Sequence, residues 1–97
     1  MDDIRFQWDE RKNKLNQQKH RISFEEAQTV FFDEHAVEFF DPDHSESEDR
    51  FLLLGLSFHL KTLVVCHCFQ ESDSVVRIIS ARKATQKERN YYERRRK

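Results

Sequence analysis

The sequence predicts an α+β domain with two N-terminal helices, a four-stranded antiparallel sheet and one C-terminal helix, the helices lying on one face of the sheet. Two observations support this: three β-rich runs follow one another across gaps of four and five residues, and helix-capping motifs lie on both sides of them. The 97 residues give room for one core, so we expect a single domain over 1–97.

The first predicted elements are a short strand over residues 4–8 and a polar helix over 10–19. Apolar and polar residues alternate along the strand, and Asp9 is a suitable N-cap for the helix. Leu15 is the only apolar residue of this helix. We therefore expect the helix to rest lightly on the body and to leave surface free for a ligand or partner.

Capping boxes predict the other two helices. Ser23 precedes Glu26 by three residues, and the apolar residues after Ser23 recur at helical spacing: Phe24, Ala27, Val30 and Phe31. Thr85 and Glu88 form the second capping box, ahead of a basic closing helix.

The predicted sheet occupies the middle of the chain. A short strand at 37–39 ends at the breaker 41–43, and an acidic loop runs on to Asp49. Three β-rich runs follow, at 50–57, 62–69 and 75–81. Gaps this short require antiparallel hairpins, because a parallel connection needs a crossover of about a dozen residues or more.

Charge is divided unevenly along the chain. Residues 1–50 hold seven basic and fourteen acidic residues, whereas 51–97 hold ten basic and four acidic. The basic end suits an anionic partner such as RNA, although the two halves can also neutralise each other in the fold. We interpret the acidic stretch 33–49 as a solvated loop rather than a Mg²⁺ site.

With no long apolar run and no basic N-terminal leader, we expect a soluble, cytoplasmic protein.

The only cysteines, Cys66 and Cys68, lie two residues apart, which places both on the same face of a strand. Together with His67 they resemble a ligand set, but His67 faces the opposite way and no second ligand pair follows at zinc-site spacing. We therefore expect structural cysteines, and neither a metal nor another cofactor.

A set of motifs extends over nearly the whole chain: Phe6-x-Trp8-Asp9, Asn16-x-x-Lys19-His20, Ser23-Phe24-Glu25-Glu26-Ala27 leading to Val30-Phe31, Glu48-x-Arg50, Gly55-x-Ser57, Arg77-Ile78-Ile79-Ser80-Ala81-Arg82-Lys83-Ala84, Glu88-Arg89 and Tyr91-Tyr92. These motifs resemble the BrnT family of toxins, part of the RelE-like ribonuclease superfamily. The resemblance implies a RelE-like fold, an RNA substrate, and an antitoxin partner with a ribbon-helix-helix domain, through which alone the toxin would reach operator DNA.

Two positions depart from the family pattern. Arg21 stands where the family usually has Gly after the Lys-His pair, and the turn before the strand 62–69 also lacks its usual Gly. Gly takes the left-handed backbone conformation most readily, so these changes affect loop geometry more than chemistry.

An endoribonuclease that works without a metal needs a base for the ribose 2′-hydroxyl, an acid for the leaving oxygen and cations for the phosphate. Arg77 lies in mid-strand among apolar neighbours, where its charge needs an open sheet face or a partner, and it is the first catalytic candidate. The alternative is a structural ion pair with Glu26 or Glu88. Arg82, at the strand exit, is the second candidate, but an unbroken strand would turn it to the opposite face, so a shared site requires a twist or bulge.

Lys19 and His20, after the first helix, complete the catalytic candidates. His20 is suited to act as acid or base and Lys19 to hold phosphate, while a helix C-terminal pair favoured by the macrodipole is the alternative.

Three further residues are candidates for substrate binding. Lys83 stands beside Arg82; Arg50 is either a third phosphate clamp or a salt-bridge partner of Glu48; Tyr92 is either a base-stacking platform or a core anchor. The predicted function is a toxin with endoribonuclease activity of low sequence selectivity, leaving a cyclic phosphate. A non-catalytic module, whose basic helix docks an antitoxin or nucleic acid, is the competing hypothesis.

Overall fold

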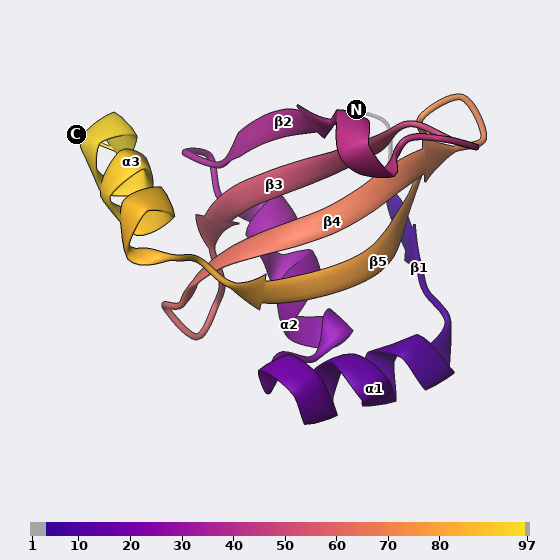
Figure 1. Ribbon diagram of the computed structural model, residues 1–97, viewed down its shortest axis with the longest axis horizontal. Helices are drawn as coiled ribbons and strands as arrows, with labels where there is room; N and C mark the ends of the chain where they lie inside the picture. The colour runs from indigo at the N-terminus through magenta and orange to yellow at the C-terminus, as the bar shows by residue number, and fades with distance from the viewer. Residues whose placement is uncertain (1–3, 97) are drawn as a thin grey trace.

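The computed structural model describes residues 4–96, which form one five-stranded sheet with three α-helices and two short 3₁₀ helices (Figure 1). The sheet order is β1-β5-β4-β3-β2, and its strands are β1 Arg5–Gln7, β2 Val37–Asp41, β3 Arg50–Leu56, β4 Thr62–Gln70 and β5 Val75–Lys83. The helices are α1 Glu10–His20, α2 Phe24–Thr29, η1 Val30–Phe32, η2 Pro42–His44 and α3 Gln86–Arg96. Over these residues, no helix is long and apolar enough to cross a membrane.

The prediction of a four-stranded sheet was wrong by one strand. β2 to β5 form the predicted antiparallel meander. β1 adds a fifth strand, parallel to β5, with Phe6 opposite Val76. The alternation of residues 4–8 predicted a strand there but not its pairing, because the partner strand lies near the other end of the chain.

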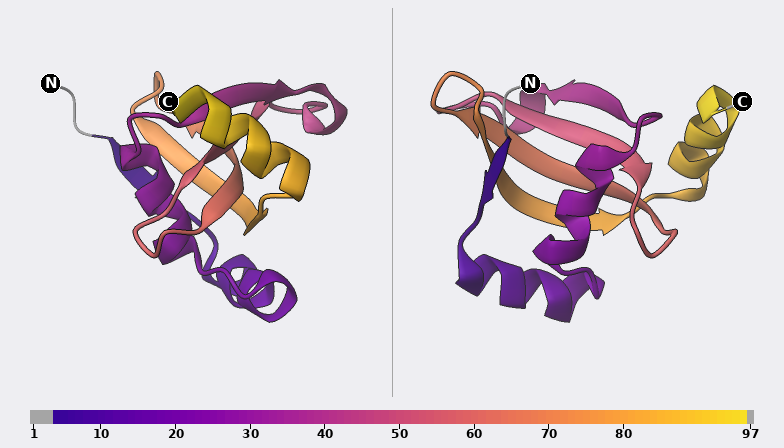
Figure 2. Two further views of the ribbon diagram at one scale, coloured as in Figure 1. Left: turned by 90° about the vertical axis from the view of Figure 1, so that its left-hand side faces the viewer. Right: turned by 180° about the vertical axis from the view of Figure 1, so that it is seen from behind.

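The helices cover both faces of the sheet, which corrects the prediction that they share one face. α2 lies behind the sheet in Figure 1 and in front of it in the view from behind (Figure 2). On that side the main cluster is made of Ile22, Phe24, Ala27, Val30, Leu53, Leu63, Val65, Val76, Ile78 and Ala81. α3 packs on the other side, where Tyr92 and Ala84 meet Leu54 and Val64. We call this second side the α3 face.

The capping predictions hold with one change. Asp9 accepts from the backbone N–H groups of Arg11 and Lys12 and so caps α1. The Ser23 hydroxyl accepts from Glu26 N and caps α2, but the Glu26 carboxylate accepts from the Ser57 hydroxyl, 2.6 Å away, rather than returning to the cap. Glu26 therefore joins α2 to the end of β3.

Helix α1 is attached by buried asparagines rather than by Leu15, which is 56% exposed. Asn16 Nδ2 donates to the carbonyls of Ile22 (2.8 Å) and Ala81 (2.9 Å), and Asn16 Oδ1 accepts from Ala81 N (3.1 Å). β1 pairs only with residues 75–77 of β5, so the backbone groups of Ala81 lie on a strand edge without a neighbouring strand. The Asn16 side chain takes the place of that missing strand.

We predict that Asn16→Leu lowers the free energy of unfolding by about 3 kcal/mol, because it leaves three buried backbone groups without partners. The matched variant is Leu15→Asn, a change on the exposed side of the same helix that should cost less than about 0.5 kcal/mol. Urea unfolding of the two proteins measures both effects. The reverse order of stabilities would mean that α1 docks through Leu15 after all.

Both positions without the expected Gly do adopt the left-handed conformation. Arg21 ends α1 at φ 62° and ψ 27°, and Leu60, in the turn between β3 and β4, also has φ 62°. A non-Gly residue costs about 1 kcal/mol or more in this region, so each turn carries a local strain.

Helix α3 is fixed to the body through Tyr92. Its side chain is fully buried, and its hydroxyl donates to the Asp33 carboxylate, which also accepts from Leu56 N. Burial and the neighbouring carboxylate raise the pKa of Tyr92, so the phenol stays protonated. Gly55 allows this approach: a Cβ there would lie 2.8 Å from Val30 Cγ1 and 3.1 Å from Asp33 Oδ2.

Candidate functional site

A β-bulge in β5 brings the two leading arginines to one face. Val76 and Ile78 belong to the main cluster, so Arg77 between them points to the α3 face. The register then shifts from His67↔Ile78 to Cys66↔Ser80, which leaves one extra residue in β5. After the bulge Ala81 faces the main cluster and Arg82 the α3 face. The sequence requirement for a bulge is thus met.

A polar cavity of about 300 Å³ lies on the α3 face, beside the acidic loop between β2 and β3. It is lined by Asp41, His44, Arg50, Leu52, Cys66, Ile79, Ser80 and Arg82. Two residues predicted from the sequence, Arg50 and Arg82, therefore lie on one cavity. The same cavity is also lined by His44, which no prediction from the sequence had pointed to.

His44 is held by Asp41, from the end of the neighbouring strand. His44 Nδ1 lies 2.9 Å from Asp41 Oδ2, and the Asp41 side chain is 13% exposed while that of His44 is 65% exposed. A carboxylate at Nδ1 favours the tautomer with its proton on that nitrogen, which leaves Nε2 as the acceptor. The many acidic residues of this stretch had predicted a solvated loop. The only signal was the three-residue spacing of Asp41 and His44 around Pro42.

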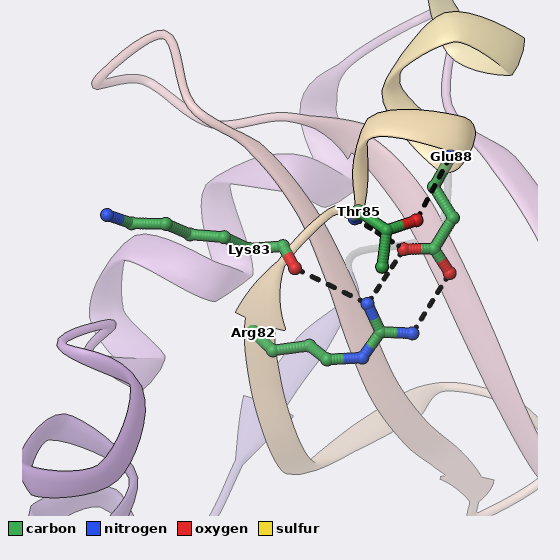
Figure 3. Close-up of polar contacts among 4 residues, drawn as sticks. All are labelled: Arg82, Lys83, Thr85 and Glu88. Atoms are coloured by element: carbon green, nitrogen blue, oxygen red, sulfur yellow. Dashed lines mark hydrogen bonds and ion pairs between the residues drawn. The ribbon is translucent and has the colours of Figure 1, made fainter.

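Arg82 makes a two-pronged ion pair with Glu88 of α3 (Figure 3). Its Nη1 lies 2.7 Å from Glu88 Oε1 and its Nη2 lies 3.0 Å from Oε2, while Nη1 also donates to the carbonyl of Lys83. A guanidinium has five N–H donors, so Nε and one Nη2 hydrogen are left for another acceptor. Thr85 and Glu88 form the predicted capping box in the same cluster.

The hydrogen bond from Arg82 lowers the pKa of Glu88 to about 2, with help from Thr85 N. A carboxyl with a depressed pKa stabilises the fold above its ordinary value of 4.5, and this contribution is lost as the pH falls toward about 2. We predict that Glu88→Gln melts at a lower temperature than wild type near neutral pH and that the difference shrinks on acidification. A difference that is constant over this range would contradict the assignment.

Arg77 and Arg50 have no counterion among residues 4–96, where neither guanidinium group takes part in an ion pair. Arg77 stands opposite Cys68 in the register, and Arg50 Nε is a buried donor for which the described residues offer no acceptor. The alternative partners proposed from the sequence, Glu26 and Glu88 for Arg77 and Glu48 for Arg50, are therefore not realised.

The cysteines have the predicted structural character. Both are free; Cys68 is buried and Cys66 is half-buried, and burial raises the pKa of each thiol. His67 lies on the opposite face, fully buried, with Nε2 2.9 Å from Glu38 Oε1. In the described part of the chain, no three His, Cys, Asp or Glu side chains gather in a way that could hold a metal.

The other sequence candidates do not join the cavity. Lys19 and His20 are in the last turn of α1, which lies along the free edge of β5 where Asn16 binds the backbone of Ala81, and neither residue lines the cavity. Lys83 points away from the Arg82–Glu88 pair (Figure 3). Tyr92 is buried, as its core-anchor alternative requires, so we remove it from the substrate-binding set.

Comparison with known proteins agrees with this fold. A crystal structure of the Brucella abortus ribonuclease toxin BrnT superposes with a TM-score of 0.65 at 24% identity, covering 86% of this chain and 99% of that one. No curated protein matches the chain in sequence. The family model for the ribonuclease toxin BrnT of type II toxin-antitoxin systems matches residues 8–88.

The match over most of the chain places the protein among the toxins of type II toxin-antitoxin systems. Within that class it belongs to the BrnT family of ribonuclease toxins. An antitoxin is therefore its expected partner.

Proposed function

We propose that this toxin is an endoribonuclease that cleaves RNA in the cavity on the α3 face without a metal ion. The observation that carries the proposal is the placement of the Asp41–His44 pair in the same cavity as Arg50 and Arg82. A base held by a carboxylate and two cations on one wall are the groups that attack by a ribose 2′-hydroxyl requires.

In the proposed reaction His44 Nε2 takes the proton of the 2′-hydroxyl. The 2′-oxygen attacks the adjacent phosphorus, the bond to the 5′-oxygen of the next nucleotide breaks, and that oxygen takes up a proton from solvent water; the hydroxide left behind is neutralised by the proton that His44 gives up. The products are a 2′,3′-cyclic phosphate and a 5′-hydroxyl. Asp41 keeps His44 in the required tautomer and stabilises the imidazolium once it forms, as an oriented carboxylate does beside other catalytic histidines.

The arginines stabilise the negative charge that builds on the phosphate. Arg82 uses the two N–H donors that Glu88 and Lys83 leave free, and Arg50 uses its guanidinium, which lines the same cavity and has no ion-pair partner among the described residues. Arg77 lies further along β5 on the same face, and it holds the neighbouring part of the RNA strand. Lys19 and His20, beside the free edge of β5 and outside the cavity, have no catalytic part in this scheme.

The antitoxin, which we propose to be of the ribbon-helix-helix type, blocks this face. The antitoxin inhibits the toxin by competing with RNA, because the arginines that attract RNA also attract an acidic protein segment. Operator DNA is bound only by the antitoxin part of the complex.

We expect the purified, antitoxin-free toxin to cleave single-stranded RNA in excess EDTA and to leave 2′,3′-cyclic phosphate ends. The reason is that the cations of the site are side chains, which a chelator cannot remove. Gel analysis of the fragments, with and without phosphatase treatment that distinguishes cyclic from linear ends, tests both points. Loss of cleavage in EDTA that Mg²⁺ restores would overturn the metal-independent mechanism. Intact RNA with folded protein would favour the non-catalytic module.

A further inference from the structure

A second cavity, of about 350 Å³, lies around the rim of the sheet from the site just described. It forms where the turn between β3 and β4 meets the connection from β5 to α3, and the hydrogen bond from Ala84 N to the Thr62 carbonyl (2.9 Å) joins the two segments. Its lining residues are Leu60, Lys61, Thr62, Lys83, Ala84 and Arg89.

Three cations and no carboxylate line this cavity. Lys61, Lys83 and Arg89 are all exposed, and across residues 4–96 none of them takes part in an ion pair. The chain as a whole has 18 acidic and 17 basic residues. A local group of three cations without a counterion therefore differs from the average charge composition of the protein. Like charges brought together in this way repel one another unless an anion lies between them.

The apolar side of the cavity has its own unusual feature. Leu60 is 78% exposed and is held in the left-handed conformation at φ 62°. Gly would occupy this position without strain and without exposing an apolar side chain. The neighbouring Phe58 is also exposed, at 73%. Local strain that the fold does not need is a reason to look for a ligand contact.

We infer that this second cavity binds a phosphate of single-stranded RNA, held by Lys61, Lys83 and Arg89, with Leu60 against the adjoining nucleoside. The inference rests on the proposed function, because it adds a binding subsite to the same substrate. Lys83 and Arg89 directly follow Arg82 and Glu88 in sequence, so an RNA strand that leaves the Arg82 cavity can pass over the rim to this subsite. Arg offers a planar fork to phosphate oxygens, and Lys adds point charges.

The test measures the salt dependence of binding to a short single-stranded RNA with 2′-O-methyl groups throughout, which has no hydroxyl to attack and cannot be cleaved. The double variant Lys61→Ala/Arg89→Ala removes two side chains. Within residues 4–96, Lys61 and Arg89 form hydrogen bonds only through their backbone groups, which the substitutions keep. The loss of one phosphate contact should reduce the slope of log K against log salt by about 0.7. Affinity near 0.1 M salt should fall by roughly tenfold.

The matched control is Arg11→Ala/Lys14→Ala, which also removes one arginine and one lysine, in this case from the exposed side of α1. It should leave the slope unchanged. Leu60→Gly keeps every cation and relieves the strained turn, so it should preserve the slope and should not lower the melting temperature, while it weakens binding a few-fold. Unchanged affinity in Leu60→Gly would exclude the nucleoside contact.

An unchanged slope in Lys61→Ala/Arg89→Ala, or an equal change in the control, would overturn the phosphate subsite. Weaker binding of the antitoxin with an unchanged RNA slope would also overturn it, because the cavity would then be a protein contact. If Lys61→Ala/Arg89→Ala shows the expected slope change on the methylated strand but wild type does not cleave ordinary RNA, the subsite stands and the proposed nuclease function fails.

Discussion

Replacing His44 by alanine is expected to slow RNA cleavage by roughly 10²–10⁴-fold, the range lost when a positioned general base is removed. The expectation follows from its contact with Asp41 at 2.9 Å and from its place on the cavity that Arg50 and Arg82 also line. The side chain is 65% exposed, so its loss should leave the melting temperature close to wild type. The rate of cleavage and the thermal midpoint are measured on the same preparation.

The pH dependence separates a base from a residue that only binds RNA. A base has to be neutral to accept a proton, so wild-type cleavage should rise with pH on the acidic side, and His44→Ala should lack this rise. His35→Ala, which removes another exposed histidine outside the cavity, should behave like wild type. Asp41→Asn should give an intermediate rate because it disturbs the tautomer without removing the imidazole. A His44→Ala variant with the wild-type rate and pH profile would exclude His44 as the base.

The local patterns of the sequence predicted most of the secondary structure. Alternation and short gaps gave the meander over β2 to β5, and capping residues located α2 and α3. The side of the sheet on which α3 packs was not predictable, because it depends on Tyr92 reaching Asp33 across the domain. The attachment of α1 was missed for a related reason. A search for hydrophobic residues points to Leu15. The helix is in fact attached by the polar side chain of Asn16, which binds the backbone of Ala81, far away in sequence.

The candidate site was predicted in part. A charged residue in an apolar strand is conspicuous, so Arg77 was singled out, and its role stays a prediction. Strand parity correctly required a bulge before Arg82 could share its face. His44 was missed because it lies among acidic residues that suggest a solvated loop, and only the fold brings that loop beside the cations. Lys19 and His20 form a visible basic motif, but the sequence does not show that α1 lies along the free edge of β5, outside the cavity.

The variant Arg82→Ala is expected to lose on the order of 10²–10³-fold in cleavage, the scale seen when one preorganised donor to a developing oxyanion is removed. Arg77→Ala removes a cation that lies further along the same face and does not line the cavity, so it should weaken RNA binding more than it slows the cleavage of bound RNA. Arg77 has no ion-pair partner within residues 4–96, so its removal should have little effect on the melting temperature. Arg82 is different: its removal also leaves the Glu88 carboxylate, whose pKa the pair depresses, without its counterion. Arg82→Ala should therefore lose stability as well as cleavage.

The two roles of Arg82 are separated by Glu88→Gln. This variant breaks the same ion pair and so should have a similarly lowered melting temperature near neutral pH, but it keeps the guanidinium on the cavity wall. If Arg82 holds the phosphate, Glu88→Gln retains most of the cleavage per folded molecule while Arg82→Ala does not. If the pair serves only to fix α3 against the sheet, both variants lose cleavage to the same extent and in proportion to the loss of folded protein. Equal losses would remove Arg82 from the catalytic set and leave Arg50 as the cation of the cavity that faces the phosphate.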